Sequence, residues 1–379
     1  MRARRGEPLA SVGQIDDERR AALARSFVGF LPREDRERNP TYWAICRGVA
    51  EDPYLLGLAD GVPPPQFATN VFLASVHDLL LGGADHPLAN RYPSVCARRG
   101  LPSAPFDEER LVASFAAFCH EHEREVVERC ATRATQTNEV SRSSVLRGAL
   151  AAIGAAHPRV ALVDLGCSAG LNLFVDAYAY RYDAGPVLGP PGATPVLECE
   201  LRGPPPPVDL PAITARIGVD LAPVDATDET AIAWLLACLW PDDTERFVRL
   251  DQAIAVAAAR HGEVSFVVGD MVRSVRPAAS LVDGDSPIVF LDSWSAAYLE
   301  RPRRAELARE LGELSTTRDV TLVSMEFPRV LVDLGVLDAA ATVEREASAV
   351  TIARFSEGRV TSTLVAECHP HGRWLAWRG

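Results

Sequence analysis

The chain has 379 residues, of which 47% are hydrophobic and 24% charged, and its formal net charge is −12. This balance is typical of a globular protein, and the acidic charge argues against a broad phosphate-binding surface. We therefore expect a small-molecule substrate and neither a nucleic-acid nor a membrane partner, while the sequence leaves the oligomeric state open.

All 39 basic residues are arginines. Because the sequence has no lysine, it excludes a Walker-type phosphate loop, a protein-kinase site and a pyridoxal Schiff base. No apolar run approaches the roughly 18 residues of a membrane span, and residues 1–20 hold arginines but no apolar signal region. The eight cysteines form no C-x-x-C pair, which favours reduced core cysteines. We expect a cytoplasmic protein.

Helical periodicity dominates residues 1–156, which we predict to be an N-terminal helical domain that caps the site or binds substrate. Apolar residues recur at helical spacing in 69–83, in 106–133 behind Asp107 as an N-cap, and in 143–158. The last of these segments leads directly into the second predicted domain.

Residues 157–379 alternate short β-rich runs with helical stretches, the pattern of a parallel α/β sheet. A closing hairpin follows, and the Pro/Gly-rich segment 184–212 is predicted to be an irregular insertion. The predicted strands are 160–165, 213–219, 264–269, 287–292, 319–325, 348–355 and 360–367.

The stretch GCSAG, residues 166–170, follows the first predicted strand and allows two interpretations. It fits a nucleophile elbow that presents Ser168, with Asp270, Asp292, His369 and His371 following in the order of a serine hydrolase. It also fits a small-residue turn against which a cofactor lies. A hydrolase elbow follows several strands, whereas this strand is the first, so position favours the cofactor turn.

Acidic residues end the next two predicted strands. Asp220 ends the second, where it could hold both ribose hydroxyls of an adenosyl group, and Asp270 ends the third, near the adenine edge. The turn lacks the second and third glycines of a dinucleotide fingerprint, which disfavours a nicotinamide cofactor. This ordered set resembles the class I S-adenosylmethionine-dependent methyltransferases. We assign to cofactor binding Asp164, Gly166, Cys167, Ser168, Gly170, Asn172, Asp220, Asp270 and Met271.

The whole chain also resembles the bacterial domain-of-unknown-function family numbered 2332. The resemblance implies a helical N-terminal region on a methyltransferase-like core, and hence a seven-stranded Rossmann-like sheet. The matching stretches are HPLANRYPS (86–94), QTNEVSRS (136–143), LGCSAGLNL (165–173), RIGVDLAPVD (216–225), WPDDTERFVRL (240–250) and HPHGRWLAW (369–377).

Candidate catalytic and substrate residues come from three further stretches, and Tyr92 is added from the stretch 86–94. Asp292 ends the fourth strand and Trp294 and Tyr298 follow it, although the two aromatic residues could simply pack the next helix. The stretch 135–143 could cap helices or close over the site as a lid. His371 could act as a base or merely end a hairpin, and no C-x-x-C pair supports a metal there, so we expect no metal. The catalytic candidates are Asp292, Tyr298, His371 and Glu139, and the substrate candidates are Gln136, Asn138, Arg142, Tyr92 and Trp294.

The expected function is S-adenosylmethionine-dependent methyl transfer to a small molecule. One alternative is a cyclase or aminocarboxypropyl transferase that uses the same cofactor and releases methylthioadenosine. The others are a serine hydrolase acting through Ser168 and a non-catalytic binding protein.

Overall fold

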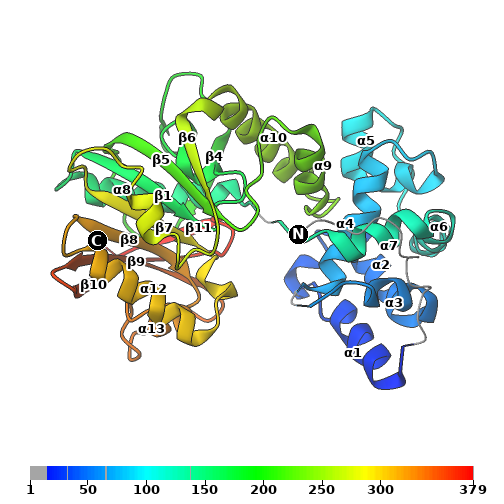
Figure 1. Cartoon of the computed structure of the whole chain (residues 1–379). Helices are drawn as coiled ribbons and strands as arrows, with labels where there is room; N and C mark the ends of the chain where they lie inside the picture. The colour runs from blue at the N-terminus through cyan, green and yellow to red at the C-terminus, as the bar shows by residue number, and fades with distance from the viewer. Residues whose placement is uncertain (1–14, 32, 65, 137, 379) are drawn as a thin grey trace. The chain divides into compact units, whose positions relative to one another are not determined.

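The structure is a computed structural model that describes residues 15–378 except positions 32, 65 and 137. The absence of a signal region, predicted from residues 1–20, therefore concerns positions that lie largely outside the described residues. Contacts divide the chain into two units (Figure 1): unit 1 lies within residues 1–137 and 229–248, and unit 2 within 138–228 and 249–379. The sequence predicts one boundary at 156, whereas the structure groups residues 138–156 with the sheet and 229–248 with the helices.

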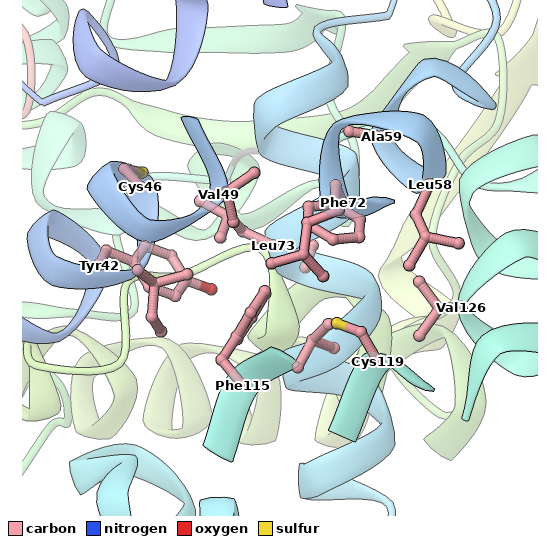
Figure 2. Packing of buried hydrophobic residues seen from close by; sticks show 14 of the residues in the cluster. Tyr42, Cys46, Val49, Leu58, Ala59, Phe72, Leu73, Phe115, Cys119 and Val126 are labelled. Atoms are coloured by element: carbon pink, nitrogen blue, oxygen red, sulfur yellow. The ribbon is translucent and has the colours of Figure 1, made fainter. Parts of the chain in front are cut away.

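Unit 1 is helical. Its core joins aromatic rings from different helices: Phe72 lies 6.1 Å from Phe27 and 5.8 Å from Phe115 between ring centroids, and Figure 2 shows Phe72 and Phe115 within the same buried cluster. The helices in this unit are α1 (Asp17–Val28), α2 (Pro40–Glu51), α3 (Pro53–Asp60), α4 (Ala68–Leu81), α5 (Pro93–Arg99), α6 (Glu108–Glu121), α7 (Glu123–Thr132), α9 (Glu229–Ala237) and the start of α10 (Thr244–Ala259).

The long helix predicted within 106–133 is two helices, because His122 leaves helical geometry at φ −113° and ψ 27°. Asp107 caps α6 as predicted, since its carboxylate accepts the Arg110 amide at 3.0 Å.

Unit 2 contains one mixed sheet of eleven strands in the order β3-β2-β4-β11-β10-β9-β8-β7-β1-β5-β6. The run from β8 to β6 is parallel, and β9 and β10 form an antiparallel hairpin beside β8. The strands are β1 (Arg159–Leu165), β2 (Ala179–Tyr182), β3 (Val187–Leu188), β4 (Val196–Leu201), β5 (Ala212–Asp220), β6 (Val264–Val268), β7 (Ile288–Ser293), β8 (Val320–Glu326), β9 (Ser348–Ser356), β10 (Arg359–Cys368) and β11 (Trp374–Trp377).

The α/β class is confirmed, but the sheet has eleven strands and not the predicted seven. The predicted irregular segment 184–212 contains β3 and β4. Together with β2, these two strands form the end of the sheet that lies opposite β6. In β4 every second residue is buried, so this segment has the alternation of a sheet strand despite its flanking prolines.

Helices cover the sheet around an apolar core. One face of β1, β7 and β8 packs through Val163, Phe290 and Leu322 against residues of the helices that follow in the chain. Those helices are α11 (Val275–Ala279), α12 (Arg301–Leu314) and α13 (Pro328–Asp333), and α8 (Ser143–Gly154) contacts β4 and β8. The glycine turn, residues 166–170, is followed by a single 3₁₀ turn, η4 (Leu171–Phe174), because the chain enters β2 almost at once.

Candidate functional site

The candidate site lies at the carboxyl end of β1. This strand pairs with β5 on one side and β7 on the other, and the chain proceeds outward first through β5 and β6 and then through β7 and β8. Ligands of open α/β sheets bind outside the carboxyl ends of the strands where the direction of winding reverses. The position between β1 and β7 is such a point.

The turn after β1 has an unusual backbone. Gly166, Ser168 and Gly170 have φ values of +74°, +49° and +67°, and only glycine adopts this region without strain. The amides of Gly166 and Cys167 both donate to the carbonyl of Val219 in β5, at 2.8 and 3.1 Å. The turn is therefore folded back over the end of the neighbouring strand.

Asp220, the last residue of β5, fixes the same turn through its side chain. Its Oδ2 accepts the Ser168 amide at 2.8 Å and its Oδ1 accepts the Ala222 amide at 2.9 Å. A carboxylate has about four acceptor positions, so two amide donors leave it acceptor capacity for a ligand.

Asp164 lies just before the turn and is fully buried. Burial raises the pKa of this carboxyl to about 8, while the Asn172 side chain, which donates at 3.4 Å, opposes the rise. Asp220 and Asp292 raise the pKa further and Arg142 lowers it. A carboxyl in this environment stays largely protonated near neutral pH unless a cation approaches.

The segment after residue 137 contacts three turns: the glycine turn, the turn that follows β7 (the β7 turn, 293–298) and the turn between β10 and β11 (the C-terminal turn, 369–373). Asn138 Nδ2 donates to the Cys167 carbonyl at 3.3 Å. Arg142 donates through Nε to the Pro370 carbonyl at 3.0 Å and through Nη1 to the Ser293 carbonyl at 3.1 Å. The stretch singled out in the sequence thus crosses the carboxyl edge of the sheet.

Several predicted residues are near this crossing. Glu139 is buried and accepts the Ser141 amide at 3.2 Å. His371 is half-buried and its amide donates to Nδ1 of His369 at 2.9 Å. Trp294 has φ +62°, its indole N–H donates to Ser348 Oγ at 3.0 Å, and its ring lies 5.4 Å from the Arg142 guanidinium carbon.

Other predicted residues have different surroundings. Asp270 accepts the Val272 and Arg273 amides at 3.2 and 3.1 Å and pairs with Arg303. Burial alone would raise the pKa of Asp270, but the Arg273 amide and the Arg303 guanidinium hold it below its usual value. Met271 packs against the core of unit 2.

Tyr298 is 74% exposed, whereas Tyr92 is fully buried in the core of unit 1. Gln136 also belongs to unit 1. The structure therefore gathers Asn138, Glu139, Arg142 and Trp294 around the sheet edge in unit 2, and it does not place Tyr92 or Gln136 in that unit.

Sequence reasoning missed Ser295 and Glu326. A Cβ added to Gly166 would lie 2.5 Å from Ser295 Cβ, so the β7 turn presses directly on the glycine turn. Glu326 ends β8 and is fully buried. Glu326, like Asp292, is an acid at the end of an apolar strand, so the same sequence pattern identifies it.

Asp292 and Glu326 hold the turn between β7 and α12. Asp292 Oδ1 accepts the Ser295 hydroxyl at 2.6 Å and the Ala296 amide at 2.9 Å, and Glu326 Oε1 accepts the Ala297 amide at 3.0 Å. Burial raises the pKa of both carboxyls, and the charge of Asp292 raises that of Glu326 further. Both residues lie on the helix-covered face of the sheet.

An exposed apolar rim borders the other side of the glycine turn. Leu221 follows Asp220 and is 75% exposed, and Val268, the register partner of Asp220 in β6, is 71% exposed. These two side chains leave apolar surface exposed at this end of the sheet.

The fold and the site define an α/β protein with a mixed eleven-stranded sheet and polar side chains at the carboxyl edge of β1. The chain belongs to the domain-of-unknown-function family 2332, described as an uncharacterized protein conserved in bacteria, whose family model matches residues 24–377. It matches no curated protein.

Three structural findings accompany this assignment. Among the described residues, no helix has both the length and the apolar character to cross a membrane. Within that same part of the chain, no group of three or more His, Cys, Asp or Glu side chains could hold a metal ion. The eight cysteines are all unpaired, and seven are buried.

Proposed function

We propose that the protein binds S-adenosylmethionine at the β1 turn and transfers its methyl group to a small molecule. The observation that carries the proposal is the position of Asp220. It lies 54 residues after Gly166 in the sequence (220 − 166), yet its carboxylate holds the amide of Ser168 at 2.8 Å. An acid beside the turn after the first strand is where an adenosyl ligand presents its ribose hydroxyls.

The sheet order supports the same proposal. Numbered along the chain, the parallel strands β6-β5-β1-β7-β8 have the order 3-2-1-4-5, the order of nucleotide-binding doubly wound sheets. With β9 and β10 they form a group of seven strands, the number of a class I methyltransferase sheet. The other four strands lie beyond β10 and leave the switch point unchanged.

The residues present suit the chemical groups of this cofactor. Asp164 is a buried carboxyl whose pKa is raised mainly by burial, and a ligand ammonium beside it would offset that rise. Asp220 retains acceptor capacity for the ribose hydroxyls. Leu221 and Val268 offer exposed apolar surface for an adenine ring.

When bound, S-adenosylmethionine supplies an electrophilic methyl group on a sulfonium, and the protein's part is to orient an acceptor toward it. Orientation and removal of water supply much of the rate of such a transfer. Glu139 lies in the crossing segment and His371 lies in the C-terminal turn that this segment contacts, and they are the best-placed candidates to accept a proton from the acceptor. Asp292 is buried and bonded to its own turn, which fits a positioning role better.

The experiment is a ligand-dependent thermal melt of the whole protein, with mass spectrometry of any ligand that co-purifies. A ligand at 100 times its dissociation constant stabilises the native state by about 2.7 kcal/mol. Adenosylhomocysteine should raise the melting temperature by several degrees and NADH should not. The proposal would be contradicted if neither adenosylhomocysteine nor S-adenosylmethionine, at saturating concentration, changed the melting temperature.

Product analysis then separates the reactions that could use this cofactor. Methyl transfer leaves adenosylhomocysteine, whereas a cyclase or an aminocarboxypropyl transferase leaves methylthioadenosine. Ligand binding without either product would indicate a binding protein.

The backbone of Ser168 favours a second candidate, a serine hydrolase. Its φ of +49° is the kind of strained geometry that a nucleophile elbow requires. A fluorophosphonate probe tests this directly: stoichiometric labelling that disappears in Ser168→Ala would replace the methyltransferase proposal.

A further inference from the structure

Two carboxyl groups outside the cofactor contacts lie beneath the β7 turn. Asp292 is in β7, Glu326 is in the adjacent strand β8, and both are 0% exposed. Each uses one oxygen to accept an amide of the turn, Ala296 for Asp292 and Ala297 for Glu326. Within the described part of the chain, the remaining oxygens, Asp292 Oδ2 and Glu326 Oε2, form no hydrogen bond, and neither does the buried hydroxyl of Ser324.

Two buried carboxylates in neighbouring strands repel each other strongly, and such pairs in proteins retain one proton between them. A proton needs no additional space, and it gives each unpartnered oxygen a partner. We infer that Asp292 and Glu326 share one proton, and that this carboxyl–carboxylate pair holds the 295–298 turn against Gly166.

The charged groups around the pair are consistent with retention of a single negative charge. Arg304 of α12 donates to the carbonyls of Ala296 and Ala297 at 3.1 and 3.0 Å, so it binds the turn and not the pair. Arg304 is itself paired with Asp333 of α13 at 2.9 Å.

The remaining neighbours of the pair are Arg142, which lowers the pKa of Glu326, Asp164 of β1, whose pKa Asp292 raises, and Ser324 of β8, whose hydroxyl lowers the pKa of Asp292. One cation therefore faces two or three acids, and full ionisation would leave excess negative charge in the interior.

The turn transmits the state of the pair to the glycine turn. Ser295 donates to Asp292 through its hydroxyl, and its Cβ occupies the space next to Gly166. Loss of the shared proton would add repulsion directly beneath Ala296 and Ala297. We therefore expect the 295–298 turn to loosen with increasing pH.

The stability test compares wild type with Glu326→Gln, in which the amide oxygen still accepts the Ala297 amide and the NH2 group donates to Asp292. The exposed Glu300→Gln serves as the matched control. A glutamate side chain in the unfolded chain has a pKa of about 4.3. In the folded protein, burial raises the pKa of Glu326 to about 9. The Glu326 carboxyl binds more protons in the folded state than in the unfolded state, so its contribution to stability is fully present below the unfolded pKa and is lost as the pH rises toward the folded pKa.

Urea unfolding from pH 6 to 8.5 should show the wild-type folding constant declining relative to Glu326→Gln by about tenfold per pH unit. Glu300→Gln should parallel wild type. Parallel profiles for wild type and Glu326→Gln would overturn the inference.

A second measurement uses the wild-type protein alone and so does not depend on the folding of a variant. Hydrogen exchange of the Ala296 and Ala297 amides in wild type, corrected for the intrinsic rate, should lose protection as pH rises toward 9. Constant protection across that range would overturn the inference. So would stabilisation of wild type, but not of Glu326→Gln, by added Na⁺, Mg²⁺ or Ca²⁺ at constant ionic strength, because a cation and not a proton would then neutralise the pair.

Discussion

The amide of Ser168 donates to Oδ2 of Asp220 at 2.8 Å, which ties the turn after β1 to the end of β5. The same carboxylate accepts the Ala222 amide through Oδ1. Both oxygens therefore face backbone N–H donors, and one side chain fixes the two loops that border the proposed ribose position.

Asp220→Asn should weaken adenosylhomocysteine binding by roughly tenfold to a hundredfold, since hydrogen bonds to a charged group contribute about 1.5–3 kcal/mol. The substitution places an NH2 group against an amide donor and removes the charge. Titration calorimetry of the folded variant measures the loss. Asp225→Asn is the control, because Asp225 only caps its own turn through Thr227, and an affinity of Asp220→Asn within about twofold of wild type would remove Asp220 from the site.

Ser168→Gly separates the two interpretations of the turn. Glycine adopts a positive φ without strain, and the bond to Asp220 comes from the backbone. Relief of strain opposes the cost of a more flexible unfolded chain, so we expect stability to change by no more than about 1 kcal/mol. Cofactor binding should persist within a few-fold of wild type. Retained ligand binding together with retained turnover supports the cofactor turn, whereas loss of a hydrolytic activity would assign the chemistry to the hydroxyl.

Gly166→Ala should destabilise the protein by about 2–4 kcal/mol, because alanine is strained at positive φ and its Cβ meets Ser295. Ser295→Gly removes the opposing Cβ, so the double variant should be less destabilised than the sum of the single variants. Urea unfolding of the four proteins gives the coupling energy, expected at about 0.5–3 kcal/mol. Strict additivity would mean that the two turns do not press on each other.

Asp164→Asn tests the proposed ammonium contact through pH. Because the pKa of Asp164 is raised to about 8, a cationic ligand group must displace its proton. The affinity of the wild-type protein for adenosylhomocysteine should therefore rise with pH between 6 and 7.5, by up to about tenfold per pH unit. Above this range the ligand's own amine begins to lose its proton, at a pKa of about 7.7–8.0.

Titration in two buffers of different ionisation enthalpy should detect proton release by wild type and little by Asp164→Asn. A wild-type affinity that is constant over this range would place the ligand amine elsewhere.

The sequence predicts the β-rich core well because its strands are buried runs of β-branched and apolar residues. All seven predicted strands are present, β5 and β6 among them. The strands β2, β3, β4 and β11 were missed because they are short, lie among prolines and glycines, and acquire their sheet role only through pairing with distant strands. The break at His122 was missed because the apolar spacing continues across it.

The site could be predicted only in part for the same reason. Strand ends are visible in the sequence, and the rule that parallel strands share a carboxyl edge brings Asp220 beside Gly166. The contact of Ser295 with Gly166 depends on register across β1 and β7, and the pairing of Asp292 with Glu326 depends on which face of the sheet each side chain occupies. Neither can be deduced from spacing along the chain.

The path of the chain between β5 and β6 has a consequence for how the protein is made. Residues 229–248 belong to unit 1, and they supply the carbonyl of Ala237 to His77, the carboxylate of Asp242 to Thr41 and the indole of Trp234 to Ala134.

Domains usually fold as units in the order in which they leave the ribosome. Here the N-terminal helices cannot complete their hydrogen bonds until more than half of the chain, including β1 and β5, has been synthesised. Neither unit can be isolated by cutting the chain once, because each is built from two separate segments of the chain.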